Sequence, residues 1–135
     1  MVPIFLIGGG WRAETFAQTY GRFLLAAARA GQTRIAIIVA EEDGGAADAH
    51  AQFLRFYGAF ETLGLARENA AEIVVSAAAP LTFDKLAETN PTGVFVCGGL
   101  TPAYYDALCL DKSWLAVLTE NEIPYSGFSA GASIA

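Results

Sequence analysis

Residues 94–101 read Val-Phe-Val-Cys-Gly-Gly-Leu-Thr, a short apolar run that ends in two glycines. Because no polar residue alternates with the apolar ones, we expect a β-strand that is buried on both faces, as in a parallel sheet covered by helices. Two earlier stretches have the same form, since Val2–Ile7 runs into Gly8-Gly9-Gly10 and Arg34–Ala40 runs into an acidic, glycine-containing turn. Ligands bind beyond the carboxyl ends of such strands, so these turns are where a functional site is expected.

Longer helical stretches alternate with the short apolar runs. The strands that we expect are Val2–Ile7, Arg34–Ala40, Glu72–Ser76, Gly93–Cys97 and Ile123–Ser126. The helices that we expect are Ala13–Ala30, Ala46–Leu63, Leu81–Glu88, Pro102–Leu108 and Ser113–Asn121. Alternation of strand and helix indicates βαβ units. The sequence therefore predicts an α/β fold of the flavodoxin-like kind, an open parallel sheet with helices on both faces, in a single domain over residues 1–135.

The composition excludes several classes of protein. Hydrophobic residues make up 54% of the 135 and charged residues 16%, whereas disordered chains combine low hydrophobicity with high charge. The net charge of −6 comes without a basic stripe, which argues against binding to nucleic acid. No apolar run approaches the ~18 residues of a membrane-spanning helix. The first residues lack the basic region of a signal peptide, and Cys97 and Cys109 have no metal-binding spacing, so we expect reduced thiols in a cytoplasmic protein.

Residues 127–131 read Gly-Phe-Ser-Ala-Gly and match G-x-S-x-G, the pattern of a nucleophile elbow. In that motif the serine occupies a strained turn between a strand and a helix, which exposes its hydroxyl. The glycines on either side prevent clashes in the turn, and the N–H of the next residue can point at a developing oxyanion. We therefore predict Ser129 as a nucleophile and Ala130 as an oxyanion donor. The alternative is a plain glycine turn with a surface serine.

The turn at Gly98-Gly99 supports this interpretation. It follows the strand that precedes the elbow strand in the sequence, and its bare backbone could supply a second N–H to the oxyanion. The alternative is a tight strand-to-helix turn in which Pro102 takes the first helical position.

At these residues the sequence resembles the S51 family of serine peptidases, which includes dipeptidase E and cyanophycinase and has a fold similar to the class I glutamine amidotransferases. Three segments carry the resemblance. They are Gly8–Gly10 after the first strand, residues 94–101, which look like the family's strand and Gly-Gly-Gly-Asn-Thr turn, and residues 127–132, Gly-Phe-Ser-Ala-Gly-Ala, which look like its G-x-S-A-G-A elbow. The resemblance implies Ser129 as nucleophile and an oxyanion hole from the N–H groups of Ala130 and of Gly98 or Gly99, with Gly99 favoured.

The resemblance also implies residues that contact the substrate. Thr101 matches the family's threonine, and Gly98 and Gly10 allow a close backbone approach to the active site. Arg12 lies at the same edge and is either a partner for a substrate carboxylate or an arginine of the helix surface. Leu100 departs from the family, which usually has asparagine there.

The general base is a second departure. In the family the triad histidine and its acidic partner follow the serine, and this sequence has six residues after Ser129. The one histidine, His50, lies in the predicted helix Ala46–Leu63 and would have to reach across from a different βα unit. A histidine at such a position usually faces solvent or pairs with a neighbour. We therefore expect the histidine and acid outside this chain, the chain to be the N-terminal part of a longer peptidase, and the 135 residues alone to be inactive.

Other features have competing interpretations. Gly8–Ala13 fits the dinucleotide-binding pattern G-x-G-x-x-A, although Glu41 comes later than the acidic residue that the pattern expects. Glu41, Glu42 and Asp43 either receive an amino group or a basic side chain of a substrate, or form a solvated acidic loop.

An amidotransferase-like hydrolase is disfavoured because those enzymes normally have cysteine where Ser129 stands. Six aromatic residues at helical spacing are expected in the core: Phe53, Phe56, Tyr57, Phe60, Tyr104 and Tyr105.

The sequence as a whole favours a serine peptidase of the S51 type that hydrolyses short peptides or a peptide-like polymer through an acyl-enzyme. This chemistry needs no metal or organic cofactor. The expected partners are a small peptide substrate and either a second copy of the chain or a complementing C-terminal segment, with no nucleic acid and no membrane. The alternative is a nucleotide-binding or pseudoenzyme α/β module without hydrolase activity.

Overall fold

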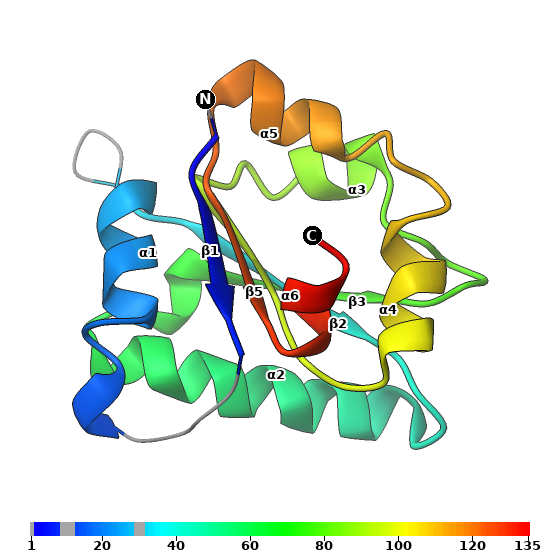
Figure 1. The fold of residues 1–135 in the computed structure, drawn as a ribbon, viewed down its shortest axis with the longest axis horizontal. Helices are drawn as coiled ribbons and strands as arrows, with labels where there is room; N and C mark the ends of the chain where they lie inside the picture. Colours follow the sequence, from blue (N-terminus) through cyan, green and yellow to red (C-terminus); the bar gives the residue numbers. More distant parts are fainter. Residues whose placement is uncertain (1, 9–12, 29–31) are drawn as a thin grey trace.

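Five parallel strands form one sheet in the parts of the chain that the computed structural model describes, residues 2–8, 13–28 and 32–135 (Figure 1). Their order across the sheet is β1-β5-β4-β2-β3, with β1 at Ile4–Ile7, β2 at Ile35–Ala40, β3 at Ala70–Val75, β4 at Gly93–Val96 and β5 at Tyr125–Phe128. The central strands β2, β4 and β5 are buried at every position, as their unbroken apolar character predicts. The edge strand β1 instead leaves Ile4 and Leu6 61% and 59% exposed.

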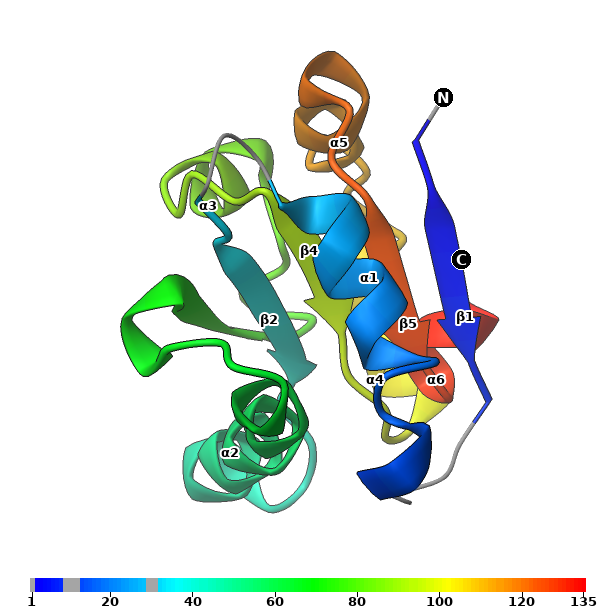
Figure 2. The same cartoon turned by 90° about the vertical axis from the view of Figure 1, so that its left-hand side faces the viewer.

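Helices cover both faces of the sheet (Figures 1 and 2). On one face, α1 (Tyr20–Ala27) and α2 (Gly45–Thr62) contribute the rings that pack on Phe95 of β4. The other face carries α3 (Phe83–Ala87), α4 (Thr101–Leu108) and α5 (Leu115–Asn121), and there Trp114, just before α5, packs on Tyr125 of β5. The single turn α6 (Ala130–Ser133) follows β5, and the described residues also form the 3₁₀ turns η1 (Ala13–Thr15) and η2 (Arg67–Asn69). The predicted α/β class with an open parallel sheet is confirmed.

The topology creates a place for a site between β2 and β4. These strands are neighbours in the sheet, but the helices that follow them, α2 and α4, lie on opposite faces. The two connections therefore diverge above the carboxyl ends of the strands, which leaves the crevice where α/β sheets bind ligands. The elbow strand β5 lies on the other side of β4, so the turn after β4 stands between this crevice and Ser129.

Every expected strand and four of the five expected helices begin and end within two residues of the predicted bounds, but the helix expected at Ala13–Ala30 does not. The expected helix Ala13–Ala30 is divided into η1 and α1, and between them the N–H of Gly21 donates to the Phe16 carbonyl five residues earlier at 2.9 Å, which is not the bonding of a regular α-helix. The expected strand Ile123–Ser126 is displaced toward the C-terminus. The N–H of Ile123 donates to the carbonyl of Leu118 in α5, and Pro124 has no N–H for a ladder, so β5 begins at Tyr125 and ends at Phe128, directly before Ser129.

An aromatic cluster on β4 forms the centre of the core. The Phe95 ring lies 5.1–6.2 Å, between centroids, from the rings of Tyr20, Phe23, Phe56 and Phe60. Phe56 also meets Phe128, the last residue of β5, in an edge-to-face contact at 5.0 Å. The core is therefore continuous with the residue that precedes Ser129.

The remaining sequence expectations for the core are largely confirmed. Tyr104 is buried as expected, whereas Tyr105 is 51% exposed because it lies on the outer side of α4. Cys97 is buried, Cys109 is partly exposed, and both are free thiols. Among the described residues, no helix combines the length and the apolar character needed to cross a bilayer.

Two buried tyrosines provide a test of the core. The hydroxyl of Tyr20 has no hydrogen-bond partner among the described residues, whereas that of Tyr57 donates to the Leu65 carbonyl at 2.9 Å. Because an unpaired buried hydroxyl costs free energy, we expect Tyr20→Phe to raise the free energy of unfolding by about 1 kcal/mol and Tyr57→Phe to lower it by about 1 kcal/mol. Urea denaturation measures both. Equal losses in the two variants would show that the Tyr20 hydroxyl is paired.

Candidate functional site

Ser129 occupies the sharp turn between β5 and α6. Its backbone has φ 50° and ψ −106°, a conformation that residues with a side chain rarely adopt and that costs about 1–3 kcal/mol. The residues on either side of it, Phe128 and Ala130, are buried, while Ser129 itself is exposed. A strained, exposed residue between a strand and a helix is the backbone geometry that the nucleophile-elbow motif requires.

The two glycines of the motif allow the turn to fold tightly. A Cβ at Gly127 would lie 2.3 Å from the carbonyl oxygen of Gly131, and a Cβ at Gly131 would lie 2.4 Å from that of Val96 in β4. Both obstacles are backbone atoms, which cannot rotate away as a side chain can. Any larger residue would therefore push the turn off β4.

Three hydrogen bonds fasten the elbow to its surroundings. The Ser129 N–H donates to the Ile7 carbonyl at the end of β1 at 2.7 Å, and the Tyr125 hydroxyl donates to the Gly131 carbonyl at 2.6 Å. The Ser129 carbonyl accepts from the N–H of Ala132 at 2.9 Å. Burial raises the pKa of Tyr125, so its hydroxyl keeps the proton that it donates. The N–H of Ala130 heads α6, where helix geometry provides no carbonyl partner for it.

The turn after β4 lies directly against the elbow. A Cβ at Gly98 would be 3.1 Å from the Cβ of Ser129 and 2.9 Å from the Phe128 ring. The Gly98 carbonyl accepts two side-chain hydrogen bonds, from Gln52 Nε2 at 3.0 Å and from the Tyr104 hydroxyl at 3.1 Å. The structure therefore brings together the two glycine turns that the sequence singled out.

The structure gives no hydrogen bond between Ser129 and the other residues that were predicted to bind the substrate, as far as these residues are described. Thr101 is exposed at the first position of α4, and Leu100 before it is exposed as well. Gly10 and Arg12, together with most of the glycine pattern Gly8–Ala13, lie outside the described residues.

The acidic turn after β2 reaches the same place. Glu41 and Asp43 are exposed, as a solvated loop predicts, but Glu42 is half-buried, and its Oε2 accepts the N–H of Leu100 at 2.9 Å. Both sequence interpretations of Glu42 were therefore incomplete, because its carboxylate binds the backbone of the turn after β4.

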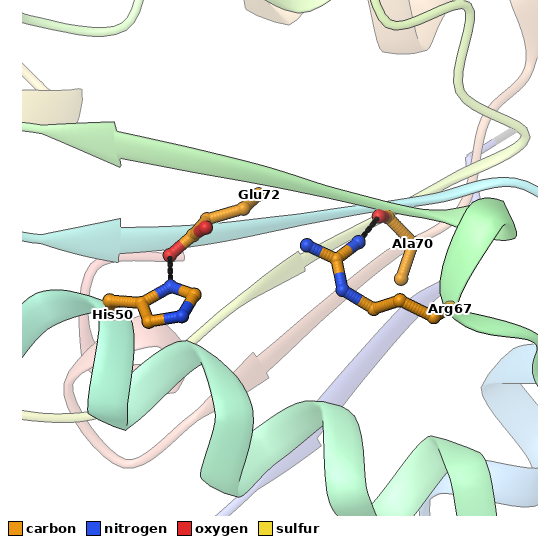
Figure 3. A network of polar contacts seen from close by, with 4 residues as sticks. All are labelled: His50, Arg67, Ala70 and Glu72. Carbon is orange, nitrogen blue, oxygen red and sulfur yellow. Dashed lines mark hydrogen bonds and ion pairs between the residues drawn. The ribbon is translucent and has the colours of Figure 1, made fainter.

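His50 does not reach the elbow. Its Nδ1 lies 2.7 Å from Oε2 of Glu72 on β3, the strand at the far edge of the sheet (Figure 3). Strands β2 and β4 separate β3 from β5, so His50 pairs with a neighbour as expected and is not the base for Ser129. The same view shows Arg67 donating to the Ala70 carbonyl at 2.6 Å, which fastens the start of β3.

A polar cavity of about 510 Å³ opens beside the turn after β4. Its lining includes Glu42, Asp43, Asp48, Gln52, Arg55 and Leu100, so acidic groups outnumber basic ones. A second cavity, of about 470 Å³, is mainly apolar and lies among β1, β5, α4, α5 and the two residues that follow α6. Within the described ranges, no group of three His, Cys, Asp or Glu side chains is placed to hold a metal ion.

Comparison with known proteins adds no further assignment. No protein-family model matches the chain, and no curated protein matches it. The resemblance to S51 peptidases is therefore carried by the three sequence segments alone.

Three side chains at the site were not anticipated as functional from the sequence: Gln52, Tyr104 and Tyr125. Tyr104 was expected in the core, where its ring does lie, but nothing in the sequence indicated that its hydroxyl binds the glycine turn. Gln52 belongs to no motif, and the bond from the Tyr125 hydroxyl to the Gly131 carbonyl crosses a turn whose shape the strand pattern does not specify.

The tight fit of the elbow predicts a large effect of one methyl group. We expect Gly131→Ala to lower the free energy of unfolding by more than about 2 kcal/mol, because the new Cβ meets the Val96 carbonyl. Gly58→Ala is the matched control, since a Cβ there has open space on α2 and should stabilise the helix by up to about 1 kcal/mol. Chemical denaturation gives both values. A Gly131→Ala variant as stable as the parent chain would contradict the close contact.

The strained conformation of Ser129 predicts an unusual order of stabilities. Glycine adopts positive φ without strain, whereas alanine does not. We therefore expect Ser129→Gly to be more stable than Ser129→Ala by about 1 kcal/mol, after allowing for the greater freedom of glycine in the unfolded chain. Thermal unfolding of the two variants measures the difference. An alanine variant that equals or exceeds the glycine variant would show that no strain is stored at this position.

Proposed function

We propose that this chain carries the nucleophile of a serine hydrolase of the S51 peptidase type, which cleaves short peptides or a peptide-like polymer. The observation that supports this best is the exposed Ser129, in a strained turn with the bare backbone of Gly98 packed against it. Stored strain at an exposed serine between a strand and a helix is the form in which hydrolases present this nucleophile.

In the proposed reaction the Ser129 Oγ attacks the scissile carbonyl carbon, and its proton passes to a general base. The carbonyl oxygen becomes an oxyanion that accepts hydrogen bonds from the N–H of Ala130 and of Gly98 or Gly99. Collapse of the tetrahedral intermediate breaks the peptide bond, and the base returns the proton to the leaving amine. Water then hydrolyses the acyl-enzyme by the reverse proton path.

The base in this proposal is a histidine from outside the 135 residues. A serine hydroxyl is a weak nucleophile without an adjacent base, and His50 is held at the far edge of the sheet by Glu72. The resemblance to the S51 family supports a histidine with an acidic partner in this role.

The environment of the thiols favours serine over cysteine chemistry. Cys97 lies next to Gly98 but is fully buried, which raises its pKa well above the ordinary value and disfavours the nucleophilic thiolate. Ser129, in the turn after β5 that packs against Gly98, is by contrast exposed. Two free thiols also fit the reducing cytoplasm, where we propose that the protein acts.

A serine-directed fluorophosphonate probe tests this proposal on the chain itself. Because the proposed base lies outside these 135 residues, we expect no substantial peptidase activity and only slow labelling. Added imidazole should accelerate labelling by supplying a base. Intact-mass and peptide analysis should locate the adduct on Ser129.

Two variants make the labelling test specific. Ser129→Ala should abolish the adduct, whereas Ser133→Ala, which removes an exposed serine from the same helical turn, should leave it unchanged. Labelling that is spread equally over both serines, or none at Ser129 with imidazole, would count against the hydrolase. Peptide turnover by the purified chain without imidazole, abolished by Ser129→Ala, would instead show that the base lies within the 135 residues.

A further inference from the structure

We propose that Gln52 and Tyr104 are positioning residues that clamp the Gly98 carbonyl and thereby turn the Gly99 N–H toward Ser129 as an oxyanion donor. This inference rests on the proposed hydrolase function. It assigns a role to two side chains that belong to none of the sequence motifs and that touch neither Ser129 nor a substrate carbonyl.

The clamp consists of two donors on one acceptor. Gln52 Nε2 and the Tyr104 hydroxyl lie 3.0 Å and 3.1 Å from the same Gly98 carbonyl oxygen. Gln52 comes from α2 and Tyr104 from α4, which are on opposite faces of the sheet, so the carbonyl is held from two directions. Burial raises the pKa of Tyr104, so its hydroxyl stays protonated and can donate.

The direction of the clamp follows from the sheet order. Gln52 lines the polar cavity together with Ala40, the last residue of β2, and both α2 and α4, which carry the two donors, pack against β2. The Gly98 carbonyl therefore points to the β2 side of β4. In a trans peptide the C=O and the following N–H point in opposite directions. The Gly99 N–H then points to the other side of β4, where β5 and Ser129 lie.

Glu42 fixes the next peptide group of the turn. Its Oε2 accepts the Leu100 N–H at 2.9 Å, and a Cβ at Gly99 would lie 2.0 Å from the same oxygen. Residue 99 therefore has to be glycine for the carboxylate to reach the backbone. The two peptide groups around Gly99 are thus held by side chains before any substrate arrives, which is the preorganisation that oxyanion stabilisation requires.

The first readout is spectroscopic and independent of activity. In isotopically labelled chain, Gln52→Met and Tyr104→Phe should each shift the Gly98 carbonyl carbon resonance to lower frequency and move or broaden the Gly99 amide signal. Tyr57→Phe is the matched control, because it removes a buried hydroxyl that binds a different carbonyl, that of Leu65, and both glycine signals should stay unchanged. Unchanged Gly98 and Gly99 signals in the two clamp variants would overturn the proposal.

The second readout is the rate at which the fluorophosphonate probe labels Ser129 in the presence of imidazole. Complete loss of one oxyanion donor lowers the rate roughly 10²–10³-fold. Because the clamp variants displace the Gly99 N–H without removing it, we expect labelling to slow by about tenfold or more. Tyr57→Phe should label at the parent rate. If Ser129 is labelled in both clamp variants at the same rate as in the parent chain, the proposal is overturned.

The two readouts separate this inference from the proposed function. If Ser129 of the parent chain is not labelled at all, the hydrolase proposal fails, and the spectra alone decide whether Gln52 and Tyr104 hold the peptide group. If Ser129 is labelled and the spectra move but the rates do not, the hydrolase proposal stands and the positioning role falls.

Discussion

The backbone contact between the elbow and the end of β4 is the constraint on which the site depends. Gly131 lies so close to the Val96 carbonyl that only a hydrogen can occupy the side-chain position, and Gly127 is equally close to Gly131. Because both glycines are packed tightly against backbone, the chain has to reverse its direction at the residues between them, and Ser129 is the one that adopts the unusual backbone conformation. Ser129 does so at positive φ, and it is exposed while both of its neighbours are buried. The exposure of the serine is thus set by packing at its neighbours.

The core supplies the free energy that maintains this strain. Residues in sparsely populated conformations cost about 1–3 kcal/mol and persist only where their surroundings over-determine them. Phe128 is anchored by its edge-to-face contact with Phe56, which in turn packs on Phe95 at the centre of the aromatic cluster. On the other side of the turn, the Tyr125 hydroxyl holds the Gly131 carbonyl. Because both flanks are fixed by buried aromatic side chains, the strain cannot relax by local movement.

The sequence predicts the features that depend on neighbouring residues, but not the contacts between distant parts of the chain. The alternation of apolar runs and helical stretches is a local signal, and it predicted the parallel sheet and the turns at Gly98 and Ser129. Pro124 shows the limit of this signal, because an apolar Ile-Pro pair looks like a strand until its missing N–H and the bond from Ile123 to Leu118 are taken into account. Gln52 could not be found at all, since its contact with Gly98 spans 46 residues and depends on the placement of α2.

The electrostatics of the site explain why local donors matter more here than the field of the whole molecule. The chain has a net charge of −6, and the cavity beside the turn after β4 includes the carboxylates of Glu42, Asp43 and Asp48. A developing oxyanion at Ser129 would meet this unfavourable field, although solvent and salt screen exposed charges beyond about 8–10 Å. N–H groups at hydrogen-bond distance act well inside that range. One of these carboxylates, that of Glu42, accepts the N–H of Leu100 in the turn itself. An acidic surface and an oxyanion site are therefore compatible as long as the turn keeps its backbone N–H groups in place.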